Sequence, residues 1–325
     1  MQRAQYVSRG PVPQEVIECV DFTLPALGPG EVLIEMLAAP INPSDVLTLT
    51  GQYGMLPPLP AVGGNEGIGR VAAVSEGVTL PIGQRVVLPI GAGTWSSHLV
   101  ARAEALVPLP DVGDVIQLSM LSVNPPTASL LLSEFVTLEP GEWVIQNTAN
   151  SAVGQYLIQL AKRRGLHTIN VVRRQDAVAQ LEALGADIVL VDGPDLANRV
   201  RDAIGKTKVR LGIDAAAGSA TDRIAQSVAI GGTVVTYGAM SGDPCKVAPG
   251  SFVFRDVTLR GFWLAFWFRT STPERQRALY GELTQLIAQG VLSAPVQATY
   301  PLSQIKDAIA AAAAGHRHGK IVVVP

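Results

Sequence analysis

The sequence predicts an α/β protein with two domains, one mostly β and one built on a doubly wound parallel sheet. Three observations support this. The 325 residues are enough for about two domains with full cores. Up to about residue 120, short β-like runs alternate with Gly/Pro turns, and helical periodicity is weak. From Leu118 to Leu264, β-like runs alternate with helix patterns, an order typical of a parallel sheet covered by helices.

In the first part of the chain, the pattern predicts strands at residues 31–36, 68–74 and 84–88. Residues 31–36 alternate between outward and inward positions. The second part yields the β-like runs 143–146, 167–172, 187–191, 211–214, 233–237 and 258–261, with helix patterns at 152–164, 177–184 and 221–229.

The tail of the chain breaks this alternation. A long helix pattern covers residues 273–289, with a proline near its start and Gly290 after its end. A strand at 296–300, an Ala-rich helix ending at Ala314 and a strand at 321–324 follow. We expect the tail to return to the first domain. The expected domains are then 1–120 completed by 268–325, and 121–267.

Composition excludes several classes of protein. The net charge is −2 and no block of Lys and Arg is present, which argues against a nucleic-acid partner. The two cysteines, Cys19 and Cys245, are too few for a disulfide framework or a zinc lobe. No apolar run reaches the length of a membrane span, and the first residues lack the apolar core of a secretory signal. We therefore expect a cytoplasmic protein without membrane contact.

The loop after the first strand of the parallel sheet resembles a dinucleotide-binding loop. Ala149 and Ser151 occupy the first two glycine positions of a Gly-x-Gly-x-x-Gly pattern, and only Gly154 is retained. The helix that follows has one apolar stripe to lie on the sheet, and its N-terminus offers free N–H groups to a pyrophosphate. Asn150 and Ser151 can add side-chain donors. The alternative is an ordinary polar turn with Ser151 as N-cap.

Two arginines, Arg173 and Arg174, lie just past the second strand of this unit. The residue at that strand tip meets the adenosine ribose: an acid there binds the 2′-hydroxyl of NAD, and an arginine accommodates the 2′-phosphate of NADP. No acid occurs before Asp176. The pattern predicts an NADPH-dependent protein, and the alternative is a pair of solvated loop arginines.

Several motifs in one order give the chain a resemblance to a known family. They are Ala39-Pro40-Ile41-Asn42-Pro43-Ser44-Asp45, Pro60-Ala61-Val62-Gly63-Gly64-Asn65-Glu66-Gly67, Val144-Ile145-Gln146-Asn147, Thr168-Ile169-Asn170-Val171-Val172-Arg173, Gly232-Thr233-Val234-Val235-Thr236-Tyr237-Gly238 and Leu259-Arg260-Gly261-Phe262-Trp263-Leu264. With these the chain resembles the medium-chain dehydrogenase/reductase superfamily, and within it the mitochondrial-type 2-enoyl thioester reductases.

The resemblance implies a GroES-like catalytic domain, a Rossmann NADPH-binding domain and a homodimer. It also implies a function in fatty acid metabolism, the NADPH-dependent reduction of the C=C bond of trans-2-enoyl-CoA or enoyl-acyl-carrier-protein. Zinc-dependent relatives place a Cys near Ser44 and a His at the position of Asn65. Neither residue present here is a credible zinc ligand, so we expect no metal.

The resemblance assigns the catalytic role to Tyr53. Hydride addition to the β-carbon of an enoyl thioester places negative charge on the carbonyl oxygen, which a phenol can stabilise, and the phenol or a linked water can supply the α-proton. The alternative is a tyrosine that packs on Pro57-Pro58. Ser44 is a second candidate, with its part in proton delivery left open.

The resemblance also assigns cofactor contacts. Asn124 matches the residue near the nicotinamide, and further contacts match the pyrophosphate loop, the 2′-phosphate segment and three other places. They are Asn150, Ser151, Ala152, Val153, Gly154, Arg173, Arg174, Gln175, Tyr237, Gly238, Ala239, Met240, Phe262, Trp263, Leu264 and Lys320.

The chain departs from the family pattern at two places. Ala239 stands where a glycine is frequent, and Ser129 stands where the family often has tyrosine. Chain-length preference and carrier therefore do not transfer. Two other functions stay open: an NADPH-dependent quinone oxidoreductase or enone reductase of the same superfamily, and a non-catalytic NADPH-binding sensor.

Overall fold

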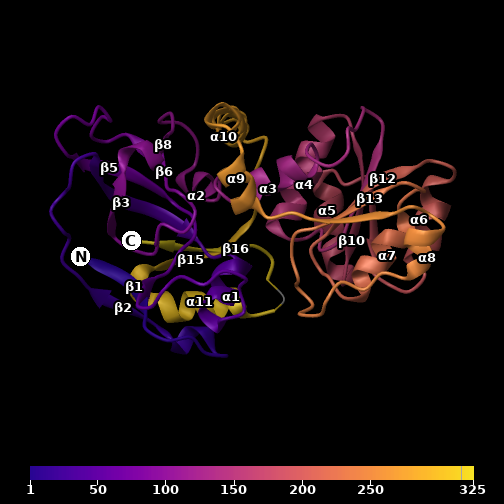
Figure 1. Ribbon diagram of the computed structural model, residues 1–325, viewed down its shortest axis with the longest axis horizontal. Coiled ribbons are helices and arrows are strands. Elements are labelled where there is room, and N and C mark those ends of the chain that lie inside the picture. The colour runs from indigo at the N-terminus through magenta and orange to yellow at the C-terminus, as the bar shows by residue number, and fades with distance from the viewer. Residues whose placement is uncertain (316) are drawn as a thin grey trace. The chain divides into compact units, whose positions relative to one another are not determined.

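The computed structural model describes residues 1–315 and 317–325 and divides them into two compact units. The first unit combines residues Met1–Val123 and Arg277–Pro325, and the second unit is Asn124–Gln276. Figure 1 shows strands in both, with helices around the strands of the second unit. The predicted fold class, α/β with a β-rich unit and a parallel-sheet unit, is confirmed.

The second unit contains a six-stranded, all-parallel sheet in the order β11-β10-β9-β12-β13-β14. The first strand along the chain lies inside the sheet, and the strand order reverses between it and its neighbour β12. This is the doubly wound arrangement that binds dinucleotides at the point of reversal. The strands are β9 (Trp143–Gln146), β10 (His167–Val172), β11 (Ile188–Val191), β12 (Val209–Asp214), β13 (Thr233–Thr236) and β14 (Thr258–Gly261).

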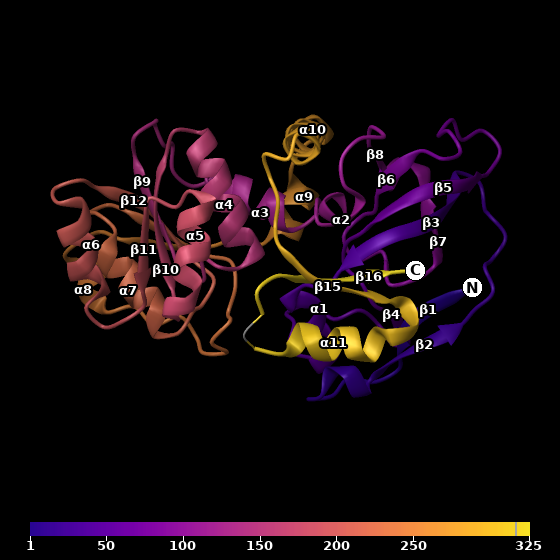
Figure 2. The ribbon, with the colours of Figure 1, turned by 180° about the vertical axis from the view of Figure 1, so that it is seen from behind.

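Helices cover both faces of this sheet (Figure 2). One apolar cluster contains Ile145, Ile169 and Ile224, and another contains Ala149, Ile158 and Leu181. Burial on both faces makes the strands nearly continuous apolar runs, which is why their positions could be predicted. The helices are α3 (Asn124–Leu131), α4 (Ala152–Arg163), α5 (Val178–Leu184), α6 (Leu196–Ile204), α7 (Ser219–Ser227), α8 (Pro249–Val253) and α9 (Leu264–Thr270), with the 3-10 turn η3 (Gln175–Ala177).

The first unit contains a sheet in the order β15-β16-β3-β5-β6-β8, with β7 paired to β3, and a smaller sheet in the order β2-β1-β4. The yellow C-terminal strand β16 pairs with β3 from the indigo part of the chain (Figure 1). The elements are β1 (Gln2–Tyr6), η1 (Pro13–Glu15), β2 (Ile17–Asp21), β3 (Glu31–Pro40), α1 (Pro43–Thr50), β4 (Ala61–Val62), β5 (Ile68–Val74), β6 (Arg85–Val87), β7 (His98–Arg102), η2 (Ala103–Ala105), β8 (Val107–Pro108), α2 (Val115–Ser119), α10 (Pro273–Ala288), β15 (Val296–Pro301), η4 (Leu302–Gln304), α11 (Ile305–Ala313) and β16 (Lys320–Val324).

The second unit extends to Gln276, beyond residue 267, because side chains hold the segment after α9 in place. Arg275 donates to Glu134 at 2.6 Å, and its guanidinium lies 5.4 Å from the ring centre of Trp267. None of the helices in the described part of the chain combines the length and the apolar character that a bilayer crossing requires.

Candidate active site and cofactor site

The loop between β9 and α4 has the local geometry of a phosphate-binding turn. Ser151 caps the helix, because its Oγ accepts a hydrogen bond from the backbone N of Gly154 at 3.1 Å. Thr148 has φ 52°, a left-handed conformation that is uncommon outside glycine. The helix therefore starts directly behind the loop, with the positive end of its dipole at the loop.

Gly154 is the one retained glycine of the pattern, and the packing requires it. A Cβ at this position would lie 2.4 Å from the carbonyl oxygen of Ala149, which belongs to the backbone and has no alternative rotamer. The absence of a side chain thus lets the first turn of α4 approach the loop closely.

Replacement of Gly154 by alanine is expected to push the first turn of α4 away from the loop. Overpacking of this kind costs about 1–3 kcal/mol, so the melting temperature falls. The affinity for a dinucleotide falls as well, because the N–H groups are displaced. Calorimetry and a titration with NADPH measure both effects. Gly281→Ala is the control, because a Cβ at that helical glycine meets no atom within 4 Å. An unchanged Gly154→Ala protein would contradict the packing argument.

The segment Tyr237–Met240 lies against the same loop. The hydroxyl of Tyr237 is hydrogen-bonded to Ser151, and burial raises the pKa of this phenol. Its backbone N donates to the carbonyl of Asp214 at 3.0 Å, and the backbone N of Met240 donates to the carbonyl of Ala215 at 3.0 Å. Residues 237–240 and the loop at residues 150–154, which the sequence analysis assigned to the cofactor separately, are therefore in contact.

Arg173, Arg174 and Gln175 follow β10, the parallel neighbour of β9, and so lie at the same edge of the sheet as the loop. Arg173 is exposed. Arg174 is half-buried, and its Nε lies 3.1 Å from the carboxylate of Asp176. Gln175 begins a 3-10 turn. In a doubly wound sheet the tip of the second strand meets the ribose of a dinucleotide, so both arginines remain candidate ligands of its phosphate.

Two polar residues that the sequence analysis missed connect strands at the reversal point. Asn147 Nδ2 donates to Asp214 Oδ1 at 2.6 Å, and Asn147 Oδ1 accepts from the backbone N of Ala215 at 2.8 Å. Asp214 is fully buried and also accepts from Thr221 Oγ1 at 2.7 Å. These bonds tie the ends of β9 and β12 together. In the sequence, Asn147 and Asp214 could have been found because each is a polar residue at the carboxyl end of an apolar strand.

The remaining contacts assigned to the second unit lie at two places. Phe262 follows β14, its ring centre is 5.7 Å from that of Phe135, and its backbone N donates to Thr236, so it lies at the same sheet edge. Trp263 is partly exposed and has Arg269 over its ring at 4.8 Å, whereas Leu264 is buried. Asn124 is buried at the start of α3, a separate place in the unit.

Lys320 belongs to the first unit, where it is part of a buried polar cluster. Its Nζ donates to Asn42 Oδ1 at 2.5 Å, and Asn42 Nδ2 donates to Glu66 Oε1 at 2.6 Å. Asp45 accepts from the backbone N of Asn42 at 2.7 Å and from that of Asn65 at 3.0 Å. The sequence analysis quoted the motifs that contain Asn42, Asp45 and Glu66 but gave these residues no role.

Burial dominates the electrostatics of this cluster. Desolvation raises the pKa of Asp45 to about 6, although two backbone N–H groups and the charge of Lys320 favour its ionised form. Desolvation also raises the pKa of Glu66 and lowers that of Lys320, each to about 8. The cluster therefore holds one ammonium group against two carboxyl groups in an environment that disfavours every charge.

Tyr53 lies on the wall of a cavity of about 320 Å³ in the first unit. It follows α1 closely: the backbone N–H groups of Gln52 and Tyr53 donate to the carbonyl of Leu47 at 2.8 and 3.1 Å. The walls are mostly apolar, with the carboxylate of Asp45 among the few polar groups. The lining residues are Tyr6, Asp45, Thr48, Leu49, Tyr53, Met55, Leu56, Pro57, Val62, Gly63, Gly64, Asn65, Ile90, Gly91 and Trp95.

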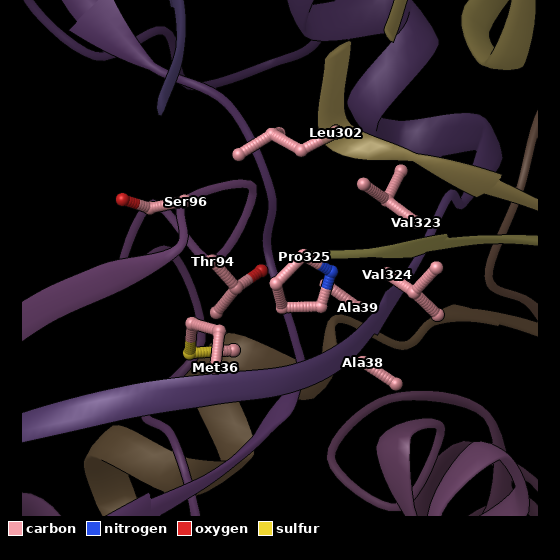
Figure 3. Close-up of a pocket in the computed structure, with 9 residues that line it drawn as sticks. All are labelled: Met36, Ala38, Ala39, Thr94, Ser96, Leu302, Val323, Val324 and Pro325. Carbon is pink, nitrogen blue, oxygen red and sulfur yellow. The ribbon is translucent and has the colours of Figure 1, made fainter. Parts of the chain in front are cut away.

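The shape of the cavity depends on two glycines beside Trp95. A Cβ on Gly63 would lie 2.3 Å from the Trp95 ring, and one on Gly64 would lie 2.7 Å from its backbone N. Met55 and Leu56, which are 57% and 41% exposed, give the opening an apolar rim. A second hollow, around the C-terminal Pro325 (Figure 3), leaves no room for a water molecule and is not a ligand site.

Ser44 and Asn65, the positions at which zinc-dependent relatives carry ligands, lie together in the structure. Asn65 Nδ2 is 3.4 Å from Ser44 Oγ. A neutral hydroxyl and an amide do not suit zinc, which binds thiolate, imidazole and carboxylate. Within the described residues no three His, Cys, Asp or Glu side chains form a group that could hold a metal ion. The residues at this place do not fit zinc.

Comparison with known proteins decides the family. Residues 28–111 match the alcohol dehydrogenase GroES-like domain, and residues 152–279 match the zinc-binding dehydrogenase model. The human mitochondrial enoyl-[acyl-carrier-protein] reductase is 39% identical over 92% of this chain and 82% of its own length. The chain belongs to the mitochondrial-type enoyl reductases of the medium-chain dehydrogenase/reductase superfamily.

Other relatives agree with this assignment. The Arabidopsis thaliana enzyme of the same name is 37% identical over 86% of this chain and 76% of its own length. The structure of an Etr1p/NADP/crotonyl-CoA complex superposes with a TM-score of 0.91 at 26% identity, covering 100% of this chain and 99% of the other. A mycobacterial quinone oxidoreductase superposes with a TM-score of 0.87 at 28% identity, covering 100% of both chains. The resemblance read from the motifs is confirmed.

Proposed function

We propose that this enoyl-reductase family member is an enzyme that reduces the C=C bond of trans-2-enoyl thioesters with NADPH. The observation that carries the proposal is the phenol of Tyr53 on the wall of a mostly apolar cavity of about 320 Å³. An apolar cavity suits an acyl chain, and a phenol on its wall can donate a hydrogen bond to a thioester carbonyl. The relatives named above act on enoyl groups carried by acyl carrier protein.

The residues of the first unit supply the proton chemistry. Bound NADPH supplies the hydride that the β-carbon of the substrate takes up. The C=C electron pair then moves toward the thioester carbonyl, and the Tyr53 hydroxyl donates a hydrogen bond to the oxygen that gains charge. Tyr53 or a water linked to it delivers the proton to the α-carbon. Asn65 lines the cavity, and its Nδ2 lies 3.4 Å from Ser44 Oγ. Through Asn65, Ser44 can assist the delivery of this proton.

The residues of the second unit hold the cofactor in this proposal. The first turn of α4 with residues 150–154 binds the pyrophosphate, because the absence of a side chain at Gly154 brings the positive N-terminal end of the helix close to the loop. Arg173, Arg174 and Gln175 bind the 2′-phosphate. Residues 237–240, which follow β13, support the loop through the hydrogen bond between Tyr237 and Ser151. Asn124, residues 262–264 and Lys320 are assigned to the cofactor by family resemblance.

A panel of acceptors tests the proposal. The protein is mixed with NADPH and crotonyl-CoA, dodecenoyl-CoA or a quinone, and the loss of absorbance at the NADPH band is followed. We expect turnover with both enoyl thioesters. A protein that consumes NADPH only with quinones would contradict the proposal, and so would one that binds NADPH but turns over none of these acceptors.

A second candidate function has one observation in its favour. The mycobacterial quinone oxidoreductase resembles the whole chain in structure at an identity similar to that of the Etr1p complex. Structure alone therefore does not separate the two acceptors. Turnover in the panel with quinones and not with enoyl thioesters would support this alternative.

We propose that the protein forms a homodimer through the edge of the parallel sheet. Within the described residues β14 pairs only with β13. The segments that lead to the first residue of β14 carry three exposed apolar side chains, Ile230, Val253 and Phe254, with exposures of 76%, 71% and 82%. A hydrogen bond between the backbone of Gly231 and Arg255 holds their two segments together.

Exposed apolar side chains beside an unpaired strand edge are typical of an interface. Sedimentation analysis tests this: the mass of a dimer supports the proposal, and the mass of a monomer contradicts it. A cytoplasmic location is likewise our proposal, which fractionation of the source cells tests.

A further inference from the structure

Glu66 is a fully buried carboxyl group whose two oxygens both accept hydrogen bonds. Oε1 accepts from the side chain of Asn42 at 2.6 Å, and Oε2 accepts from the backbone N of Val123 at 2.9 Å. Burial of a carboxyl group is costly unless its partners are well placed. The proposed reduction leaves this group without a role.

Hydrogen bonds at the two ends of helix α1 connect Glu66 to the backbone of Tyr53. Asn42, which Glu66 holds, is the residue before helix α1, and the carbonyl of Leu47 in α1 accepts from the backbone N of Tyr53 at 3.1 Å. The helix is only eight residues long, so a short stretch of backbone separates Asn42 from the carbonyl that holds the backbone of Tyr53. Gly51 ends the helix in a left-handed conformation with φ 78°, which directs the chain back toward that carbonyl.

Position 66 needs two acceptor oxygens, which a glutamate side chain supplies. The Asn42 amide donates to Glu66 and accepts from Lys320, so it connects an acceptor to a donor. A glutamine at position 66 would keep one acceptor but would turn an NH2 group toward one of the two donors. Asp45 and Arg317 are the other charged groups that act on Lys320, and Asp45 also acts on Glu66.

We propose that Glu66 is a positioning residue for the reduction, acting through Asn42 and helix α1 to hold the hydroxyl of Tyr53 at the substrate carbonyl. The inference rests on the proposed function. It adds a role for a residue that does not line the cavity, and this role differs from the catalytic role of Tyr53. Its physical basis is that a displacement of about 1 Å in a reacting group costs up to about 100-fold in rate.

A double-mutant cycle separates positioning from general stability. Glu66→Gln is made in the wild-type and in the Tyr53→Phe background, and kcat with crotonyl-CoA is measured together with the Kd of NADPH. We expect kcat to fall by about 10- to 100-fold in the first background and by less than about twofold in the second. The Kd of NADPH stays within about twofold. A loss of the same size in both backgrounds would overturn the proposal, because a merely structural role lowers both.

Hydrogen exchange followed by mass spectrometry gives a readout that needs no turnover. Glu66→Gln is expected to weaken protection of peptides that cover residues 43–53, while peptides from β9 to β14 keep theirs. Glu35→Gln is the matched control, because Glu35 lies in the same unit in an exposed ion pair with Arg70. Unchanged protection at residues 43–53 in the Glu66→Gln protein would overturn the proposal.

A second variant keeps the inference testable if Glu66→Gln does not fold. Asn42→Ser retains a residue that favours the start of α1 but removes the amide that reaches Glu66. We expect Asn42→Ser to lower kcat in the wild-type background and to have little effect in the Tyr53→Phe background, as Glu66→Gln does. Absence of wild-type turnover with enoyl thioesters would contradict the proposed function. Wild-type turnover with unaltered kcat in both the Glu66→Gln and Asn42→Ser proteins would contradict only the positioning role.

Discussion

Tyr53→Phe is expected to lower kcat with enoyl thioesters by about 100- to 1,000-fold, the loss typical when one donor to a developing oxyanion is removed. The substitution deletes one oxygen and keeps the ring, so the wall of the cavity retains its shape. Binding of NADPH should change little, because the cofactor loop lies in the second unit. Steady-state kinetics with crotonyl-CoA and a fluorescence titration with NADPH measure the two quantities.

Tyr300→Phe is the matched control for this prediction. It removes the same hydroxyl from a tyrosine on β15 that does not line the cavity. We expect wild-type kcat for this control. Equal turnover by the Tyr53→Phe protein would remove the phenol from the proposed chemistry, whereas a higher KM at constant kcat would assign it to substrate binding alone.

The double substitution Arg173→Ala with Arg174→Ala is expected to weaken NADPH binding strongly and to leave NADH binding nearly unchanged. Hydrogen bonds to a charged group are worth about 1.5–3 kcal/mol, which corresponds to roughly 10- to 100-fold in affinity. The difference arises because only NADPH carries the 2′-phosphate. Arg174 is already 3.1 Å from the carboxylate of Asp176, so we expect Arg173 to contribute the larger share.

The ratio of the Kd values for NADPH and NADH is the quantity that tests this prediction. Lys162→Ala with Arg163→Ala is the matched control, since it also removes two positive charges but at the last turn of α4, the end opposite the loop. A ratio that is the same in both double variants would refute the assignment of the arginines to the phosphate and leave only a general effect of charge.

Much of the second unit could be predicted because its signals are local. Strands buried on both faces are continuous apolar runs, and the predicted strands at 143–146, 167–172 and 258–261 coincide with β9, β10 and β14. The helix α4 has eight buried residues and ends close to the expected residue. Neighbouring parallel strands then bring the loop and the two arginines to one edge of the sheet.

The helix that carries the Tyr53 turn was missed for a physical reason. Helix α1 has eight residues and buries only Asp45 and Leu49, so no apolar periodicity distinguishes it from the strands around it. Its start depends on the carboxylate of Asp45, which accepts from the backbone N of Asn42. A polar contact of this kind leaves little trace in hydropathy.

The amino-acid sequence alone therefore determined the α/β class, the family and the edge of the sheet proposed for the cofactor, since each depends on patterns within a few tens of residues. Tertiary structure alone decided the cavity at Tyr53 and the cluster of Asn42, Glu66 and Lys320. Asn42 and Lys320 are 278 positions apart along the chain, and Asn42 and Glu66 are 24 apart. Whether a charged residue is solvated or buried depends on the partners that folding brings to it. The order of residues along the chain does not show these partners.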